Sequence, residues 1–269
     1  MSKLGVVEDT LFIPMQGRIY ASEQCPQILY DQKALELKDK LPTGLLEQAR
    51  QSQYTLLASA VRSANMDRCI HAFLKRRPDG VIVQLGCGLE TAYYRCDNGM
   101  TRWYAVDLPN VIAYRRELLP EPERETCIAG DAFSDDWIRR VRREAPDAPL
   151  LVTAGGLFYY FDEKQVVGLL RALGRFGKTE IVFDAVSKGG MMMMRKKYMR
   201  QLEHADARMI FYVDAAVELA SQLSSTAVVL EEEPYYRHTQ RTGLKLSTRA
   251  SMAVSDRLKM LKMIHLSIG

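Results

Sequence analysis

The sequence predicts an α/β fold in which helices cover both faces of a mostly parallel sheet. Three observations lead to this prediction. Short apolar runs of strand type alternate with helical patterns through the middle of the chain. The first run, 81–85, ends in Gly86 and Gly88, and the second, 102–106, ends in Asp107 about 20 residues later. A glycine turn after one strand and a carboxylate after the next are typical of a nucleoside-binding unit.

Local patterns predict the elements in order. Residues 1–30 are expected to be irregular, because Pro14, Gly17 and Pro26 interrupt them. Helical spacing of apolar residues predicts helices over 31–41, 44–64, 65–75, 109–118, 135–144 and 162–175. Strand-type runs predict strands over 81–85, 102–106, 126–129, 150–153, 180–183, 228–230 and 262–267. Residues 187–222 keep helical periodicity without a strand, which indicates an insertion.

These elements suggest one domain over residues 1–269. We expect an N-terminal helical cap over 1–77 and a donor-binding α/β core over 78–186. A helical insertion over 187–225 follows, and strands in 226–269 would complete a seven-stranded sheet.

Composition places the chain among ordinary soluble proteins. The net charge of +4 is too small to indicate nucleic-acid binding, and the basic residues are spread along the chain. No run approaches the ~18 apolar residues of a membrane span. The five cysteines are odd in number and form no C-x-x-C pair, so we expect neither disulfides nor a metal site, and a reducing cytoplasm as the location.

The residues beside the glycine turn favour a ligand without phosphate. A dinucleotide site needs a small residue three positions after Gly88, where Thr91 stands. Glu90 is expected to repel a diphosphate. Both features favour S-adenosylmethionine over a nicotinamide dinucleotide. The alternative is structural: the glycines merely end a strand, and Asp107 caps a helix that starts at Pro109.

Residues after the third and fourth strands are candidates for the rest of the pocket. Asp131 can accept a hydrogen bond from the adenine amine, with the backbone of Ala132 against the ring, or it can cap a helix. Gly155 and Gly156 leave room above the sheet. Tyr160 belongs to an aromatic run that either faces a ligand or packs in the core.

Four segments together carry a resemblance to a known family. They are 62–67 (RSANMD), 84–91 (QLGCGLET), 103–109 (WYAVDLP) and 128–131 (IAGD). The chain resembles the leucine carboxyl methyltransferase family, most closely the bacterial branch that includes tetracenomycin polyketide O-methyltransferases. The resemblance implies a class I methyltransferase (Rossmann-like) fold. It also implies use of S-adenosylmethionine to methylate a carboxylate, or sometimes a hydroxyl, of a small molecule.

The resemblance also implies roles for individual residues in binding the donor. Arg62 would pair with the carboxylate of the donor's methionine part. The other predicted donor-site residues are Gly86 and Gly88 at the methionine part, Asp107 with the adjoining Leu108 at the ribose, Asp131 with Ala132 at the adenine, and Gly155. Arg18 would bind the donor or an acidic substrate, unless it is a solvated surface arginine. Arg18 and Tyr160 are positioning candidates, and no catalytic base is assigned.

The chain departs from the family pattern at Gly155. Family members usually carry a glutamate at this position, beside the donor and the substrate. Its replacement by glycine leaves the usual substrate open and predicts a larger pocket.

Methyl transfer to a carboxylate needs no base, because the acceptor is already ionised at neutral pH. A phenolic acceptor would benefit from one, and the candidates are His204, His238, Tyr212, Tyr235 and Tyr236. Met191 to Met194 with the basic residues after them form either a substrate wall or a packed helix. Glu231 to Glu233 are expected to be a solvated charge run. A donor-binding protein without transfer activity and a nicotinamide oxidoreductase are the alternative functions.

Overall fold

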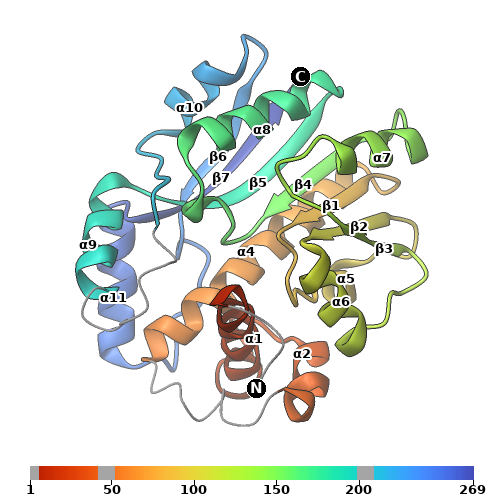
Figure 1. Cartoon of the computed structure of the whole chain (residues 1–269). Helices are drawn as coiled ribbons and strands as arrows, with labels where there is room; N and C mark the ends of the chain where they lie inside the picture. Colours follow the sequence, from red (N-terminus) through yellow and green to blue (C-terminus); the bar gives the residue numbers. More distant parts are fainter. Residues whose placement is uncertain (1–5, 42–51, 199–208) are drawn as a thin grey trace.

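A seven-stranded sheet forms the centre of the protein. The computed structural model describes residues 6–41, 52–198 and 209–269, with backbone only for 6–10 and 195–198 (Figure 1). The strand order is β3-β2-β1-β4-β5-β7-β6. The strands are β1 Val81–Leu85, β2 Arg102–Asp107, β3 Glu125–Ala129, β4 Leu150–Ala154, β5 Thr179–Val186, β6 Val228–Pro234 and β7 Leu261–Ile268. Strands β1 to β5 are parallel, and β7 runs antiparallel to both β5 and β6. The predicted mostly parallel sheet is confirmed.

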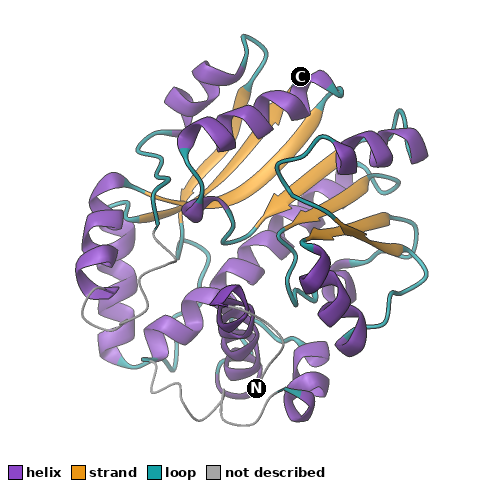
Figure 2. Ribbon diagram, viewed as in Figure 1, coloured by secondary structure: helices purple, strands orange, loops and turns teal. Residues whose placement is uncertain are grey.

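Helices cover both faces of this sheet, as Figure 2 shows. Side chains alternate between the faces, so Trp103 of β2 packs under α4 (Gln53–Arg76) while Tyr104 packs under α7 (Asp136–Glu144). The other core-covering helices are α5 Ala92–Cys96, α6 Pro109–Leu118 and α11 Leu246–Arg257 on the α4 side, and α8 Glu163–Arg175 and α10 Ala216–Leu223 on the α7 side. Every residue of β1 and β4 is buried, as expected for parallel strands covered on both faces.

The expectation of an irregular N-terminus is wrong for the described residues. Helix α1 spans Val6–Gln24 and contains Pro14. The helix packs along α4, and an added Cβ on Gly17 would lie 2.5 Å from the carbonyl oxygen of Leu56. Gly17 therefore allows two helices to approach closely, rather than making a turn. Helix α2 (Gln32–Leu37) and a 3-10 turn (Lys38–Lys40) follow.

Two helices were predicted where the structure has one. Helix α4 is continuous over Gln53–Arg76 and begins at Ser52, whose side chain accepts a hydrogen bond from the amide of Thr55. No glycine or proline stands at the expected break near residue 64, so nothing interrupts the helix. The predicted stretch 44–51 lies outside the described residues.

The C-terminal third departs from prediction in two ways. Helix α11 lies between β6 and β7, where only strands were expected. Residues 231–233 belong to β6 and form ion pairs with Arg68 and Lys262, so they are not a solvated run. The insertion contains α9 (Lys188–Tyr198) and α10. Within the described ranges, none of the helices combines the length and the apolar character that crossing a bilayer requires.

Candidate functional site

The carboxyl ends of four neighbouring strands bring the predicted donor residues to one edge. Gly86 follows β1, Asp107 ends β2, Asp131 follows β3, and Gly155 follows β4. Hydrogen bonds join the adjacent loops at this edge: the amide of Gly130 donates to the Asp107 carbonyl at 2.9 Å. Ligands of open α/β sheets bind beyond the carboxyl ends of the strands, so this edge is the candidate site.

The glycine turn after β1 needs both of its glycines. Gly86 has a φ of +59° and Gly88 a φ of +47°, a left-handed conformation that side chains disfavour. An added Cβ would lie 2.8 Å from Leu157 at Gly86 and 3.0 Å from Leu11 of α1 at Gly88. Leu11 and Leu157 thus border the turn, and no sequence pattern had indicated either.

The carboxylate of Asp107 stabilises the same glycine turn. It accepts hydrogen bonds from the amides of Gly88 and Leu108, each at 2.8 Å. Burial raises the pKa of Asp107, and the two amide hydrogen bonds oppose this rise. An ionised carboxylate has about four acceptor positions, so two remain for ribose hydroxyls. Leu108 is 42% exposed beside it. This geometry therefore allows both interpretations of Asp107. The carboxylate stabilises the turn, and its remaining acceptor positions can bind a ligand.

Asp131 is exposed at the neighbouring loop. Its carboxylate accepts a hydrogen bond from the amide of Phe133 at 2.9 Å, and its carbonyl accepts one from Ser134. The side chain therefore stabilises its own turn. Ala132 is buried in the core below it. The contact of both residues with adenine stays a prediction.

Arg62 reaches the edge from α4 and meets Asp184 of β5. The Arg62 Nε donates to Asp184 Oδ2 at 2.7 Å. Asp184 also accepts hydrogen bonds from the Gly156 amide at 2.6 Å and from the Tyr159 hydroxyl at 2.8 Å. Burial alone would lower the pKa of Arg62, but the Asp184 carboxylate more than offsets this, and the net shift is upward. Asp184 thus holds the Nε side of the Arg62 guanidinium, and the Tyr235 hydroxyl also interacts with this guanidinium. The contact of Arg62 with a donor carboxylate stays a prediction.

The space beside Gly155 is not open. An added Cβ on Gly155 would lie 3.2 Å from Cδ of Arg62, and one on Gly156 only 2.6 Å from its Nη1. The arginine side chain therefore lies against both glycines. The carboxylate that faces Arg62 in this chain comes from Asp184 on the neighbouring strand β5.

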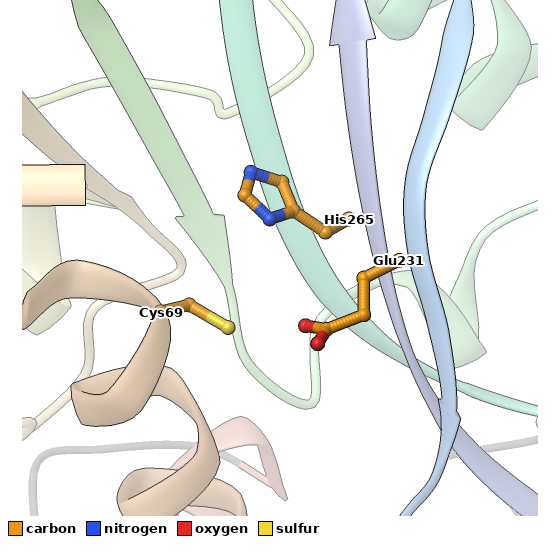
Figure 3. A group of neighbouring side chains, drawn as sticks. All are labelled: Cys69, Glu231 and His265. Atoms are coloured by element: carbon orange, nitrogen blue, oxygen red, sulfur yellow. The ribbon is translucent and has the colours of Figure 1, made fainter. Parts of the chain in front are cut away.

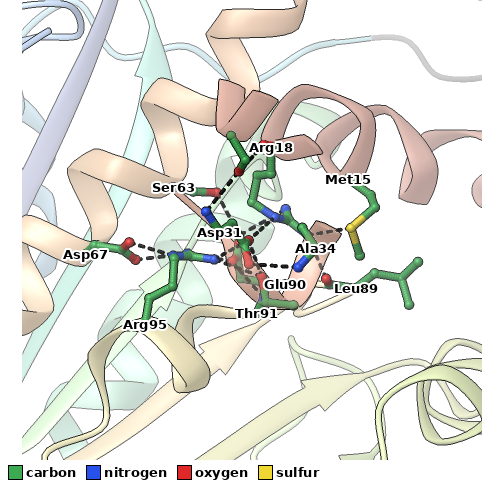
Figure 4. Close-up of polar contacts among 12 residues, drawn as sticks. Met15, Arg18, Asp31, Ala34, Ser63, Asp67, Leu89, Glu90, Thr91 and Arg95 are labelled. Carbon is green, nitrogen blue, oxygen red and sulfur yellow. Dashed lines mark hydrogen bonds and ion pairs between the residues drawn. The ribbon is translucent and has the colours of Figure 1, made fainter. Parts of the chain in front are cut away.

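Arg18 is buried in an ion-pair network beside the glycine turn (Figure 4). Its Nε and Nη1 donate to Asp31 and Glu90, and its Nη2 donates to the Leu89 carbonyl at 2.7 Å. Arg95 bonds to the same two carboxylates. The Asp31 network, as we name it, comprises Arg18, Asp31, Ser63, Asp67, Glu90, Thr91 and Arg95. These contacts give Arg18 a structural role, and its contact with a donor or a substrate stays a prediction.

The same network changes the interpretation of Glu90. Burial would raise the pKa of Glu90, but Arg18 and Arg95 outweigh it, and the pKa lies well below its usual range. The carboxylate also accepts a hydrogen bond from Ser63 at 2.8 Å. Glu90 is therefore ionised, and Arg18 and Arg95 neutralise its charge. Repulsion of a diphosphate is not the role of this carboxylate. Its sequence position beside the turn could not reveal partners on α1 and α5.

The remaining candidates lie in different places. Tyr160 follows β4 in a short 3-10 turn and is 43% exposed. Tyr235 is buried and donates to the Ala58 carbonyl, while His238 pairs with Glu233 on β6. Tyr236 is buried as well, and Tyr212 is 41% exposed. His204 lies outside the described residues. Met191 is buried, whereas Met192 and Met193 are exposed on α9.

Replacing Arg62 with lysine is expected to weaken donor binding about tenfold, or ~1.4 kcal/mol. Lysine lacks the planar fork of arginine, so it cannot keep one edge on Asp184 and present a second edge to a donor carboxylate. Isothermal titration calorimetry with S-adenosylmethionine measures the effect. The control is Arg76→Lys, on the same helix in an exposed pair with Glu180. Equal affinities of the two variants would remove Arg62 from the donor site.

Comparisons with known proteins show which sequences and folds this chain is similar to. The family described as leucine carboxyl methyltransferase matches residues 15–174. The tetracenomycin polyketide synthesis O-methyltransferase TcmP of Streptomyces glaucescens is 31% identical over 186 residues, which cover 68% of this chain and 67% of that protein. Among solved structures, a DUF574 family protein from Streptomyces avermitilis has a TM-score of 0.60 at 14% identity, covering 94% of this chain and 97% of that one. A putative methyltransferase from Thermobifida fusca has a TM-score of 0.54 at 15% identity, covering 94% and 93%. The predicted fold class is confirmed.

Proposed function

Because the chain belongs to the leucine carboxyl methyltransferase family, we propose that it methylates a carboxylate of a small, polyketide-like acid. Membership makes the chain an S-adenosylmethionine-dependent methyltransferase. The proposal concerns the acceptor. The Streptomyces relative is named for O-methylation in tetracenomycin polyketide synthesis, which supports an acceptor of this class.

Several features of the edge formed by β1 to β4 support binding of the donor there. Gly86 and Gly88 expose backbone at the turn, and Asp107 keeps two acceptor positions for the ribose. At the other end, Arg62 lies against Gly155 and Gly156 with its Nε on Asp184, and we propose that its Nη groups receive the donor carboxylate. When bound, S-adenosylmethionine supplies an electrophilic methyl group on a sulfonium. The residues of the chain bind and align, and we assign none of them a proton transfer.

The positions of the histidines support a carboxylate rather than a phenol as the methyl acceptor. Within the described ranges the chain has His71, His238 and His265. His71 is exposed on α4, His238 pairs with Glu233, and His265 pairs with Glu180. None of these three follows a parallel strand at the donor edge. A carboxylate acceptor is ionised at neutral pH and needs alignment rather than a base, so it suits this edge better than a phenol.

The test compares two acceptors that differ in one group. The protein is incubated with methyl-labelled S-adenosylmethionine and either an aromatic carboxylic acid or the phenol of the same ring system. We expect label in the product of the acid, released as methanol by alkali, because methyl esters are cleaved by base and methyl ethers are not. Label that resists alkali, or label on the phenol alone, would replace the proposal with hydroxyl methylation.

A second control separates transfer from binding. The Asp107→Ala variant receives the same acids and donor. Loss of ester formation in this variant assigns the labelled product to the edge described above. If wild-type protein bound the donor but labelled no acid or phenol from a metabolite extract, the donor-binding alternative without transfer would hold instead.

A further inference from the structure

Three side chains of a type that binds transition metals meet on the α4 side of the sheet, apart from the donor edge. They are Cys69 of α4, Glu231 of β6 and His265 of β7 (Figure 3). One potential ligand atom from each lies within 4.8 Å of the others. Cys69 and His265 are buried, and Glu231 is half-buried. The family likeness and the proposed function make no use of these residues.

The histidine is oriented as a metal ligand would be. Its Nε2 is hydrogen bonded to Glu180 of β5 at 2.8 Å. Figure 3 shows the other ring nitrogen directed toward the space between Cys69 and Glu231. A carboxylate on one ring nitrogen fixes the tautomer and leaves the second nitrogen as a lone-pair donor, an arrangement common behind metal-bound histidines.

A cavity gives an ion and a water molecule access to this cluster. All three residues line one cavity of about 280 Å³, together with Arg68 and Arg76. The cavity provides room for a fourth ligand from solvent, which a site with three protein ligands requires.

The local charges are compatible with a bound cation. Arg68 pairs with Glu231 at 3.0 Å and with Glu233 at 2.8 Å, and Arg76 pairs with Glu180 at 2.9 Å. Arg237 also pairs with Glu233 at 3.3 Å, so three glutamates face three arginines, and a thiolate would add a negative charge.

We propose that Cys69, Glu231 and His265 bind a zinc-like divalent ion. Sulfur and imidazole ligands select zinc and its neighbours over magnesium or calcium, which prefer oxygen alone. Tetrahedral zinc places its nitrogen and sulfur ligands about 3.5 Å apart, so side-chain movements of roughly 1 Å complete the site. The ion joins α4 to the antiparallel strands β6 and β7. Arg62 lies seven residues before Cys69, two turns along the same face of α4, about 10 Å away.

Cobalt titration of the reduced, metal-free protein tests this assignment. Co²⁺ replaces Zn²⁺ in such sites and gives a thiolate-to-cobalt charge-transfer band in the near ultraviolet. We expect the band to saturate at one ion per chain, to disappear on addition of Zn²⁺, and to persist with Mg²⁺. Absence of the band in the wild-type protein at excess cobalt would overturn the proposal, whatever the variants do.

Two variants and one matched control locate the ion. Cys69→Ser is expected to abolish the band, and His265→Gln to weaken cobalt binding at least tenfold. Cys25→Ser is the control, since Cys25 is buried in the same core cluster as Cys69 but lies outside the metal site. Zinc should raise the thermal midpoint of the wild type and the control but not of Cys69→Ser. A band that survives in Cys69→Ser would place the cobalt elsewhere and refute the assignment.

Discussion

Replacing Asp107 with alanine is expected to weaken the binding of S-adenosylmethionine about 100-fold. Two ribose hydroxyls that bond to an ionised carboxylate contribute at least ~1.5 kcal/mol each, or ~3 kcal/mol together. Alanine also removes the acceptor for the Gly88 amide, which the carboxylate holds at 2.8 Å. Calorimetric titration measures the affinity, and thermal unfolding shows whether the variant remains folded.

The control for this prediction is a nearby carboxylate with a purely local role. Asp135→Ala removes a half-buried aspartate at the start of α7, which pairs with Arg139 and Arg175 on the surface. Its donor affinity should match that of the wild type. A folded Asp107→Ala protein with unchanged affinity would remove the ribose assignment, and a loss in both variants would mean that the effect is not specific to the turn.

Replacing Asp31 with alanine is expected to lower the free energy of unfolding by about 3–5 kcal/mol. Removing one partner of a buried ion pair leaves the other charge buried without compensation. Asp31 is fully buried and its Oδ2 pairs with both Arg18 and Arg95, while its Oδ1 caps α2 through the Ala34 amide at 2.9 Å. Denaturant unfolding gives the difference.

An exposed pair on the same helix provides the comparison. Lys33 and Glu36 of α2 lie 2.9 Å apart, and both are substantially solvent-accessible. Such pairs contribute about 0–1 kcal/mol, so Glu36→Ala should leave the unfolding curve nearly unchanged. If Asp31→Ala cost no more than Glu36→Ala, the Asp31 network would not be what holds α1 and α2 against the glycine turn.

The sheet and the position of the candidate edge were predictable because their signals are local. Apolar runs between glycines and prolines predicted the positions of all seven strands, and the glycines after β1 and the aspartate of β2 marked the edge. The N-terminal helix was missed for a tertiary reason. Pro14 and Gly17 are helix breakers in isolation, but the burial of Phe12, Met15 and Ile19 in α1 outweighs them.

The partners of the charged residues were not predictable in the same way. Glu90 and Asp184 were visible in the sequence, yet their meaning depends on contacts made across the fold. Glu90 meets Arg18 from 72 positions away, and Asp184 meets Arg62 from 122 positions away. The spacing of residues along the sequence does not indicate which distant charged residues pair in the fold. The same holds for Cys69, Glu231 and His265, whose wide separation hid the candidate metal site.

A crystal structure with S-adenosylhomocysteine bound would show whether the Gly86–Gly88 turn and Asp107 hold the donor. We expect both ribose hydroxyls to lie about 3 Å from the carboxylate of Asp107. The amino-acid carboxylate should meet the Nη groups of Arg62, and the adenine should lie beside Asp131 and Ala132. A ligand bound away from the Gly86–Gly88 turn, or one whose ribose faces away from Asp107, would contradict this expectation.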